Sequence, residues 1–136
     1  MKKLKFLDFL LPAFCILLLL IGSCSEDEEL NRDPNNVTLS APSNGATDVL
    51  LNADLTWQAT TDPDGDAIVY DVYFGTDATP ATIASSNQSG TSYSPTVEAN
   101  NTYYWKIVAK DPNGGSSQSA TWSFTTLNNG PGTVVL

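Results

Sequence analysis

The loop Asp62-Pro63-Asp64-Gly65-Asp66 holds the densest group of chemically useful side chains in this sequence. Its three carboxylates occupy alternate positions, and carboxylate oxygens are the hard ligands that Ca2+ prefers. The loop lacks the glycine directly after the third acidic position and the distal glutamate that complete a helix-flanked calcium loop. Aspartates in turns commonly accept hydrogen bonds from backbone amides. We therefore expect a solvated turn at Asp62, Asp64 and Asp66, with Ca2+ binding as the alternative and no other cofactor.

Two tyrosines form a second group of candidate residues. Tyr73 and Tyr104 lie out of phase with the apolar residues that alternate around them, so each is expected on the outer face of a sheet. An exposed tyrosine can stack on a sugar or anchor a protein partner. The alternative is ordinary cross-strand packing on that face.

Several kinds of chemistry are missing from the sequence. The chain has no histidine, and its two cysteines, Cys15 and Cys24, both lie near the N-terminus. This excludes Ser-His triads and histidine-ligated metals, and it leaves no cysteine pair to form a stabilising disulfide within the domain. Carboxylate pairs can hydrolyse glycosides, but the acids here fall mostly in turns and near the N-terminus. We expect a protein that is not an enzyme.

The charge balance excludes another class of partner. The formal net charge is −9. Beyond residue 23 the bases are only Arg32, Lys106 and Lys110, whereas a nucleic-acid binder needs clustered Lys and Arg to neutralise phosphates. Nucleic-acid binding is therefore not expected.

The first 24 residues have the pattern of an export signal. A basic start with Lys2, Lys3 and Lys5 precedes an apolar run and the small pair before Cys24. The segment Leu20-Ile21-Gly22-Ser23-Cys24 resembles the bacterial lipobox, which implies cleavage before Cys24 and acylation of that cysteine, for example by palmitate. Several acyl chains hold a protein stably on a membrane. The alternative, a membrane-spanning helix, needs about 20 apolar residues, and the uninterrupted run from Ala13 is about half as long.

The residues after Cys24 indicate where in the cell the protein is sent. Ser25-Glu26-Asp27-Glu28-Glu29 resembles the acidic export signal of surface lipoproteins in Bacteroidetes-type bacteria. The resemblance implies an outer-membrane lipoprotein that faces the cell exterior, and a periplasm-facing protein is the alternative. As a like-charge run it also predicts an extended, disordered tether over residues 24–35.

Short alternating runs from Val37 onward predict an all-β domain. Apolar residues recur at every second position between clusters of Gly, Pro, Asn, Asp and Ser, and no helical period is present. Seven strands are predicted, at residues 37–41, 54–60, 68–75, 81–84, 92–96, 102–110 and 120–126. Trp57, Trp105 and Trp122 are expected to dominate the core of a two-sheet sandwich.

The same strands carry a family pattern. Leu55-x-Trp57, Tyr70-x-Val72-x-Phe74 and Tyr103-x-Trp105-x-Ile107-x-Ala109 follow one another in order. Together they resemble a fibronectin type III domain over residues 36–126, in which Tyr103 would form the corner between the fifth and sixth strands. Val97 and Ala99 stand where that family usually has leucine and proline. A general immunoglobulin-like sandwich is the alternative.

The sequence thus predicts four segments: a signal peptide at 1–23, the lipidated tether at 24–35, the β-sandwich at 36–127, and a linker or tail at 128–136. The expected function is non-catalytic interaction or adhesion with an envelope or extracellular protein. Polysaccharide capture through Tyr73, Tyr104 or the Asp62–Asp66 loop, and a spacer without a ligand, are the alternatives, because fold does not decide function.

Overall fold

The structure is a computed structural model that describes residues 29–129. Within that range it contains nine β-strands and no helix: β1 (Leu39–Ala41), β2 (Ala46–Val49), β3 (Leu55–Trp57), β4 (Val69–Gly75), β5 (Ile83–Gln88), β6 (Ser92–Tyr93), β7 (Thr102–Lys110), β8 (Ser116–Gln118) and β9 (Trp122–Thr126). No segment of residues 29–129 forms a helix long and apolar enough to cross a membrane.

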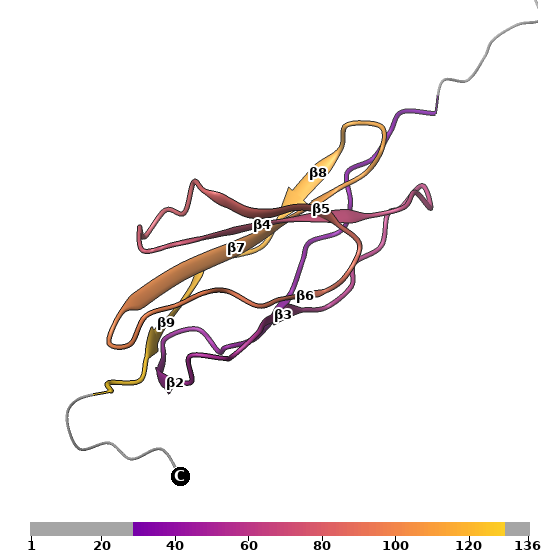
Figure 1. Ribbon diagram of the computed structural model, residues 1–136. Coiled ribbons are helices and arrows are strands. Elements are labelled where there is room, and N and C mark those ends of the chain that lie inside the picture. Colours follow the sequence, from indigo (N-terminus) through magenta and orange to yellow (C-terminus); the bar gives the residue numbers. More distant parts are fainter. Residues whose placement is uncertain (1–28, 130–136) are drawn as a thin grey trace, which may run out of the picture. The chain divides into compact units, whose positions relative to one another are not determined.

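The strands form two sheets that pack as a sandwich (Figure 1). The smaller sheet has the order β1-β3-β6, and the larger has the order β2-β9-β7-β4-β5 with β8 added beside β7. All pairs are antiparallel except β2 with β9. The chain therefore moves from one sheet to the other between β1 and β2.

The core follows from the period-2 alternation of the longest strand. In β7, Tyr103, Trp105, Ile107 and Ala109 are all buried, and the residues between them are partly exposed. From the opposite sheet, Leu55 and Trp57 are buried against them, as predicted. Of the three tryptophans, Trp57 and Trp105 are buried, and Trp122 is only partly buried. Its ring meets that of Trp105 edge to face at 6.2 Å.

Two tyrosine hydroxyls tie loops to this core. Tyr103 Oη accepts a hydrogen bond from the backbone N–H of Glu98 at 2.9 Å, which confirms the predicted corner although Val97 and Ala99 replace the usual residues. Tyr70 Oη accepts from the N–H of Thr60, also at 2.9 Å. Each hydroxyl thereby accepts a hydrogen bond from a backbone N–H that lies in a loop outside the sheets.

The predicted strands are all present, but the bounds and the count differ. The strand expected at 81–84 is β5 at Ile83–Gln88, and β2 and β8 were not predicted. β8 is Ser-Ser-Gln and pairs with β7 through its backbone, so it leaves no hydrophobic alternation. β2 is short, contains Asp48 at a φ of 55°, and has an irregular register with β9. Apolar periodicity cannot detect strands of these two kinds.

The compact domain begins earlier than the sequence indicated. It starts at Asn31, whereas the sequence predicted a tether as far as residue 35. Asn35 N–H donates to Thr61 O at 3.0 Å, and Ser117 Oγ donates to Asn35 O at 2.9 Å. Residues 31–35 lie against the domain because these backbone and side-chain hydrogen bonds hold them there.

Candidate functional site

The Asp62–Asp66 loop joins β3 to β4 and folds as an Asx-type turn. Asp62 Oδ1 accepts a hydrogen bond from the N–H of Asp64 at 2.7 Å, and Gly65 N–H donates to Asp62 O at 3.1 Å. Gly65 has a φ of 84°, which glycine adopts without steric cost. The turn was predicted from the aspartates, and its aspartate oxygens cap backbone amides as expected.

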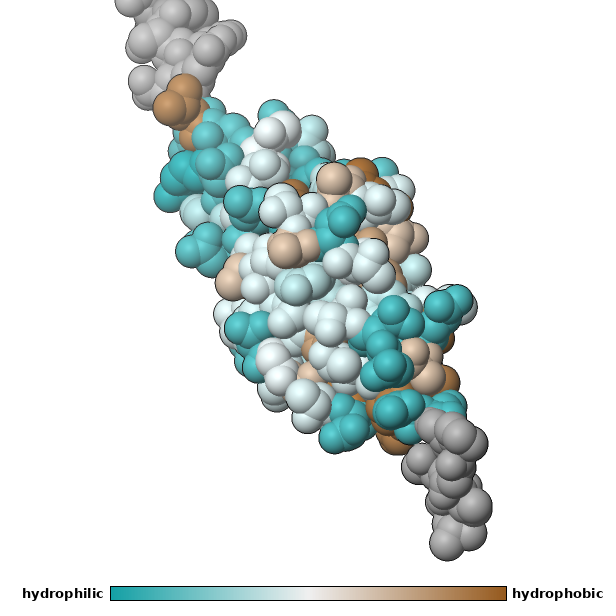
Figure 2. All heavy atoms as spheres, turned by 90° about the vertical axis from the view of Figure 1, so that its left-hand side faces the viewer, coloured by the Kyte–Doolittle hydropathy of each residue, from teal (hydrophilic) through white to brown (hydrophobic). Residues whose placement is uncertain are grey.

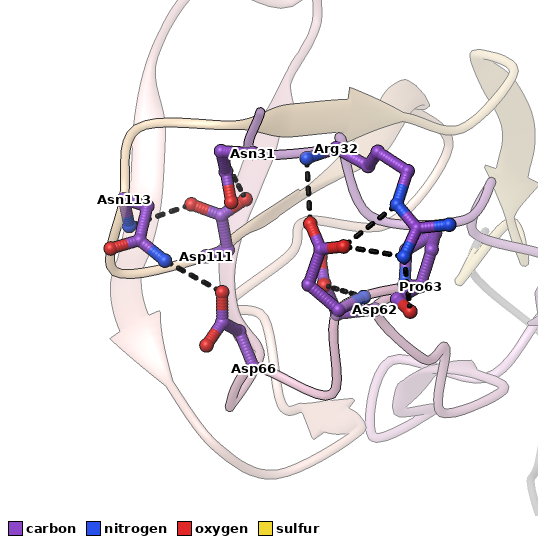
Figure 3. A network of polar contacts seen from close by, with 8 residues as sticks. Asn31, Arg32, Asp62, Pro63, Asp66, Asp111 and Asn113 are labelled. Atoms are coloured by element: carbon purple, nitrogen blue, oxygen red, sulfur yellow. Dashed lines mark hydrogen bonds and ion pairs between the residues drawn. The ribbon is translucent and has the colours of Figure 1, made fainter. Parts of the chain in front are cut away.

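The second aspartate of the loop binds the N-terminal segment (Figure 3). The backbone N–H and the Nε of Arg32 each donate to Asp64 at 2.7 Å, and the guanidinium forms an ion pair with Asp64 Oδ1 at 2.6 Å. The guanidinium also donates to Pro63 O at 3.0 Å. The hydrogen bonds from Arg32, backbone first and then side chain, lower the pKa of Asp64 below its usual range.

The third aspartate faces the loop between β7 and β8. Asn113 Nδ2 donates to Asp66 Oδ2 at 2.6 Å, which links the two loops (Figure 3). In the same loop, Asp111 Oδ2 accepts from Asn31 Nδ2 at 3.0 Å, and Asp111 Oδ1 accepts from the amides of Asn113 and Gly115 at 2.8 and 2.9 Å. These bonds, that from Asn31 above all, lower the pKa of Asp111.

The packing around Asp111 leaves no room for a larger residue at Gly115. A Cβ atom there would collide with the Asp111 carboxylate and lie 3.0 Å from both Asn31 Nδ2 and Asp33 Oδ1. We call the Asp62–Asp66 loop and the loop between β7 and β8, together with residues 31–35, the polar pole. Its hydrogen bonds explain why the chain enters the domain along a fixed path.

The three loop aspartates do not gather around one point. Asp64 is bound to Arg32 and Asp66 to Asn113. Across residues 29–129 no three acidic, histidine or cysteine side chains are placed to hold a metal ion together. Asp62 Oδ2 is buried and has no hydrogen-bond partner in this part of the chain. Ca2+ binding at Asp62, Asp64 and Asp66 stays the untested alternative to a simple turn.

An open pocket of about 420 Å³ lies beside this loop. Its lining combines Asp62 and Asp66 with the apolar surfaces of Ile68 and Tyr70 and reaches Ser89 on the far side. Tyr70 is only 3% exposed, so the pocket surface that a ligand could reach is mostly that of the loop and of Ile68.

The two candidate tyrosines lie on the outer face of the larger sheet. Tyr73 in β4 and Tyr104 in β7 are both partly buried, and neither belongs to the core. The ammonium of Lys106 lies 5.0 Å from the centre of the Tyr73 ring, in the geometry of a cation–π contact. Gly75, which has no side chain, is the register partner of Tyr104. The tyrosines thus share a face, and one ring is already in contact with a cation.

Sequence reasoning missed several residues of these two regions, among them Lys106, Arg32 and Asn31. Lys106 follows Tyr104 by two positions, so the strand period already placed it on the same face. Arg32 lies 32 positions before Asp64, and Asn31 lies 80 before Asp111, so no local pattern marks either pair. Cys24, the predicted lipidation site, lies outside the described residues.

The outer face also contains a partly buried ion pair. Lys110 Nζ lies 2.6 Å from Asp71 Oδ2 and donates to Asn87 Oδ1 at 2.8 Å. Asp71 is 6% exposed, and its other oxygen accepts the Asn87 N–H at 2.8 Å. Through Asn87, this pair binds the end of β5 to the sheet. The Lys110 ammonium is therefore already paired within the domain.

Comparison with known proteins supports the fold only. No family model matches the chain, and no curated protein sequence matches it. Among solved structures, the sixth fibronectin type III domain of human fibronectin type III domain containing protein 3 is similar over 82% of this chain and 99% of its own, with a TM-score of 0.56 and 16% identity. Another fibronectin type III domain of that human protein is similar over 79% and 99%, with a TM-score of 0.55 and 16% identity. Residues 31–129 therefore have the fold of a fibronectin type III domain.

Proposed function

We propose that this chain is a non-catalytic lipoprotein of the outer membrane that faces the cell exterior and uses its fibronectin type III-like domain to bind another protein. The observation that supports the proposal is the fibronectin type III-like fold, which is consistent with a protein-interaction domain. The lipobox-like segment ending at Cys24 and the acidic run after it supply the anchor and the address. The absence of histidine from the whole sequence supports a non-catalytic role.

The surface of the domain favours recognition of a specific partner over association through one large hydrophobic patch. In residues 29–129 the large exposed hydrophobic residues are Leu30, Leu50 and Ile83. The face drawn in Figure 2 is mostly hydrophilic or neutral, with apolar residues in small groups. A partner would therefore be recognised through a few anchors with polar surroundings, which is the ordinary composition of a non-obligate interface.

Lipidation at Cys24 and exposure on the cell exterior are tested in the host cell. Labelled fatty acid should attach to the full chain and not to the Cys24→Ala variant. Protease added to intact cells should remove the domain if it faces the exterior. Label that persists after Cys24→Ala would refute lipidation at this residue, and a domain spared by protease in cells that remain intact would refute the exterior address.

The interaction itself is tested by co-purification. The full chain, tagged at its C-terminus and solubilised from its own envelope, should retain another protein in fixed stoichiometry. A Leu55→Ala variant, whose fold is weakened, serves as the control for non-specific retention. The absence of any stoichiometric protein would contradict the proposal and favour a spacer without a ligand.

The pocket beside Asp62 favours a second candidate function, polysaccharide capture. Its carboxylates could accept hydrogen bonds from sugar hydroxyls, and the partly exposed Ile68 would supply an apolar contact. Residues 31–136, tested against a polysaccharide panel, should then show saturable binding that Asp66→Ala weakens and Tyr104→Ala does not. Binding lost equally in both variants would place the sugar elsewhere.

A further inference from the structure

Four side chains of the outer sheet face lie side by side because of the strand register. Ile83 in β5 is the register partner of Tyr73 in β4, and Tyr73 is the partner of Lys106 in β7. Tyr104 precedes Lys106 by two residues and therefore projects from the same face. We call Ile83, Tyr73, Tyr104 and Lys106 the Lys106 face.

Lys106 differs from the other cations of the described residues. Arg32 pairs with Asp64 and Lys110 pairs with Asp71, each at 2.6 Å. In residues 29–129 Lys106 has no carboxylate within ion-pair distance. It lies 5.0 Å from the Tyr73 ring centre, and its Nζ reaches Gln118 Oε1 only at 3.4 Å. The ring holds the ammonium in place, and most of its hydrogen-bonding capacity is left for an outside acceptor.

The surroundings of this ammonium would strengthen an ion pair made with a partner. Ile83 is 47% exposed and Tyr73 and Tyr104 are partly exposed, so a docked chain would exclude water from the cation. Removal of water raises the strength of a charge pair and of its hydrogen bonds. Tyrosine is also enriched among the residues that dominate binding at protein interfaces.

Charge complementarity therefore identifies the chemistry of the occupant. We propose that the Lys106 face docks a segment of another protein in which an Asp or Glu side chain stands beside an apolar one. The carboxylate would bind Lys106, and the apolar side chain would pack on Ile83 beside Tyr73, its register partner. This inference rests on the proposed protein-binding function and assigns it a surface.

Two further features agree with this occupant. The Lys106 ammonium covers part of the Tyr73 ring, so a sugar stacked there would first have to displace the cation. The domain as a whole is acidic, but its field is screened within about 8 Å at physiological ionic strength. The contact is therefore decided by the local charge at Lys106.

The test places a photo-crosslinking residue, p-benzoylphenylalanine, in the full chain within its own host. One variant has it at Ile83, a second at Ser92 on the exposed surface of the smaller sheet, and a third at Asn113 on the polar pole. We expect a protein adduct from position 83 and none from the other two. Mass spectrometry should place an Asp or Glu within a few residues of the attachment site.

Matched variants then test the role of the charge. Lys106→Gln should reduce the adduct from position 83 about tenfold, because it removes the cation of a desolvated pair. Arg32→Gln changes the net charge equally but lies on the polar pole, so it should leave the adduct unchanged. Thermal unfolding of each variant shows that the fold is retained, since Lys106 and Ile83 lie outside the core.

The outcomes separate this inference from the function on which it rests. Adducts from Ser92 or Asn113 but not from position 83 would overturn the Lys106 face and leave a protein-binding function intact. Adducts that Lys106→Gln does not weaken, or that join only copies of this chain or a polysaccharide, would also overturn it. No adduct from any position would count against the proposed function itself.

Discussion

The hydroxyl of Tyr103 gives the sharpest test of how the fold is held together. Tyr103→Phe keeps the ring, which stacks on Phe74 at 5.0 Å, and removes only the acceptor for the Glu98 N–H. A net intramolecular hydrogen bond contributes about 0.5–1.5 kcal/mol, and leaving a partly buried N–H without an acceptor adds to the loss. We expect the free energy of unfolding to fall by about 1–2 kcal/mol.

The neighbouring residue supplies a matched control. Tyr104 lies on the outer face, and its hydroxyl has no hydrogen bond within the described part of the chain. Tyr104→Phe should therefore change stability by less than about 0.5 kcal/mol. Urea unfolding of residues 31–136, followed by tryptophan fluorescence, measures both. If Tyr103→Phe is as stable as the native chain, or if both variants lose the same amount, the corner does not stabilise the fold as argued.

Three further predictions concern the core, the outer-face ion pair and the polar pole. Leu55→Ala empties a fully buried position and should cost about 2–5 kcal/mol in urea unfolding; a loss under about 1 kcal/mol would contradict the assigned core. Lys110→Met leaves the buried Asp71 without its cation and should cost about 1–3 kcal/mol, whereas a neutral result would mean that the pair adds nothing. The pKa values of Asp64 and Asp111 are lowered by folding, so their contribution to stability is present above about pH 4 and is lost as the pH falls from there toward their lower folded values. Arg32→Gln removes the guanidinium but keeps the backbone N–H that binds Asp64, so it should reduce and not abolish the part of this acid dependence that comes from Asp64; an unchanged pH profile would argue against a contribution from the guanidinium.

The strands with a buried face could be predicted from the sequence. The bounds of β7 follow from the alternation at Thr102–Lys110, and Leu55 and Trp57 mark β3 as a core strand. In each case the side chains themselves carry the signal, because one face of the strand must be apolar. β8 has only polar side chains, and the two apolar residues of β2, Ala46 and Val49, stand three positions apart, so neither strand shows the alternation that marks a strand.

The candidate sites were predictable only in their residues and not in their contacts. The Asp62 turn followed from local turn chemistry, because its hydrogen bond spans two residues. The pairing of Asp64 with Arg32 depends on the path by which the chain enters the domain. The contact between Tyr73 and Lys106 depends on the register of β4 with β7, which is fixed by the folded core.

Lys106 is the centre of the proposed protein-binding surface, and a charge exchange at this residue tests that binding most directly. Once the adduct from position 83 identifies the partner's acidic residue, Lys106→Glu in this chain should abolish the adduct. Replacing that acidic residue by lysine in the partner should then restore it, because the same pair is rebuilt with its charges reversed. An adduct that survives Lys106→Glu, or that the exchanged partner does not restore, would contradict protein binding at Lys106.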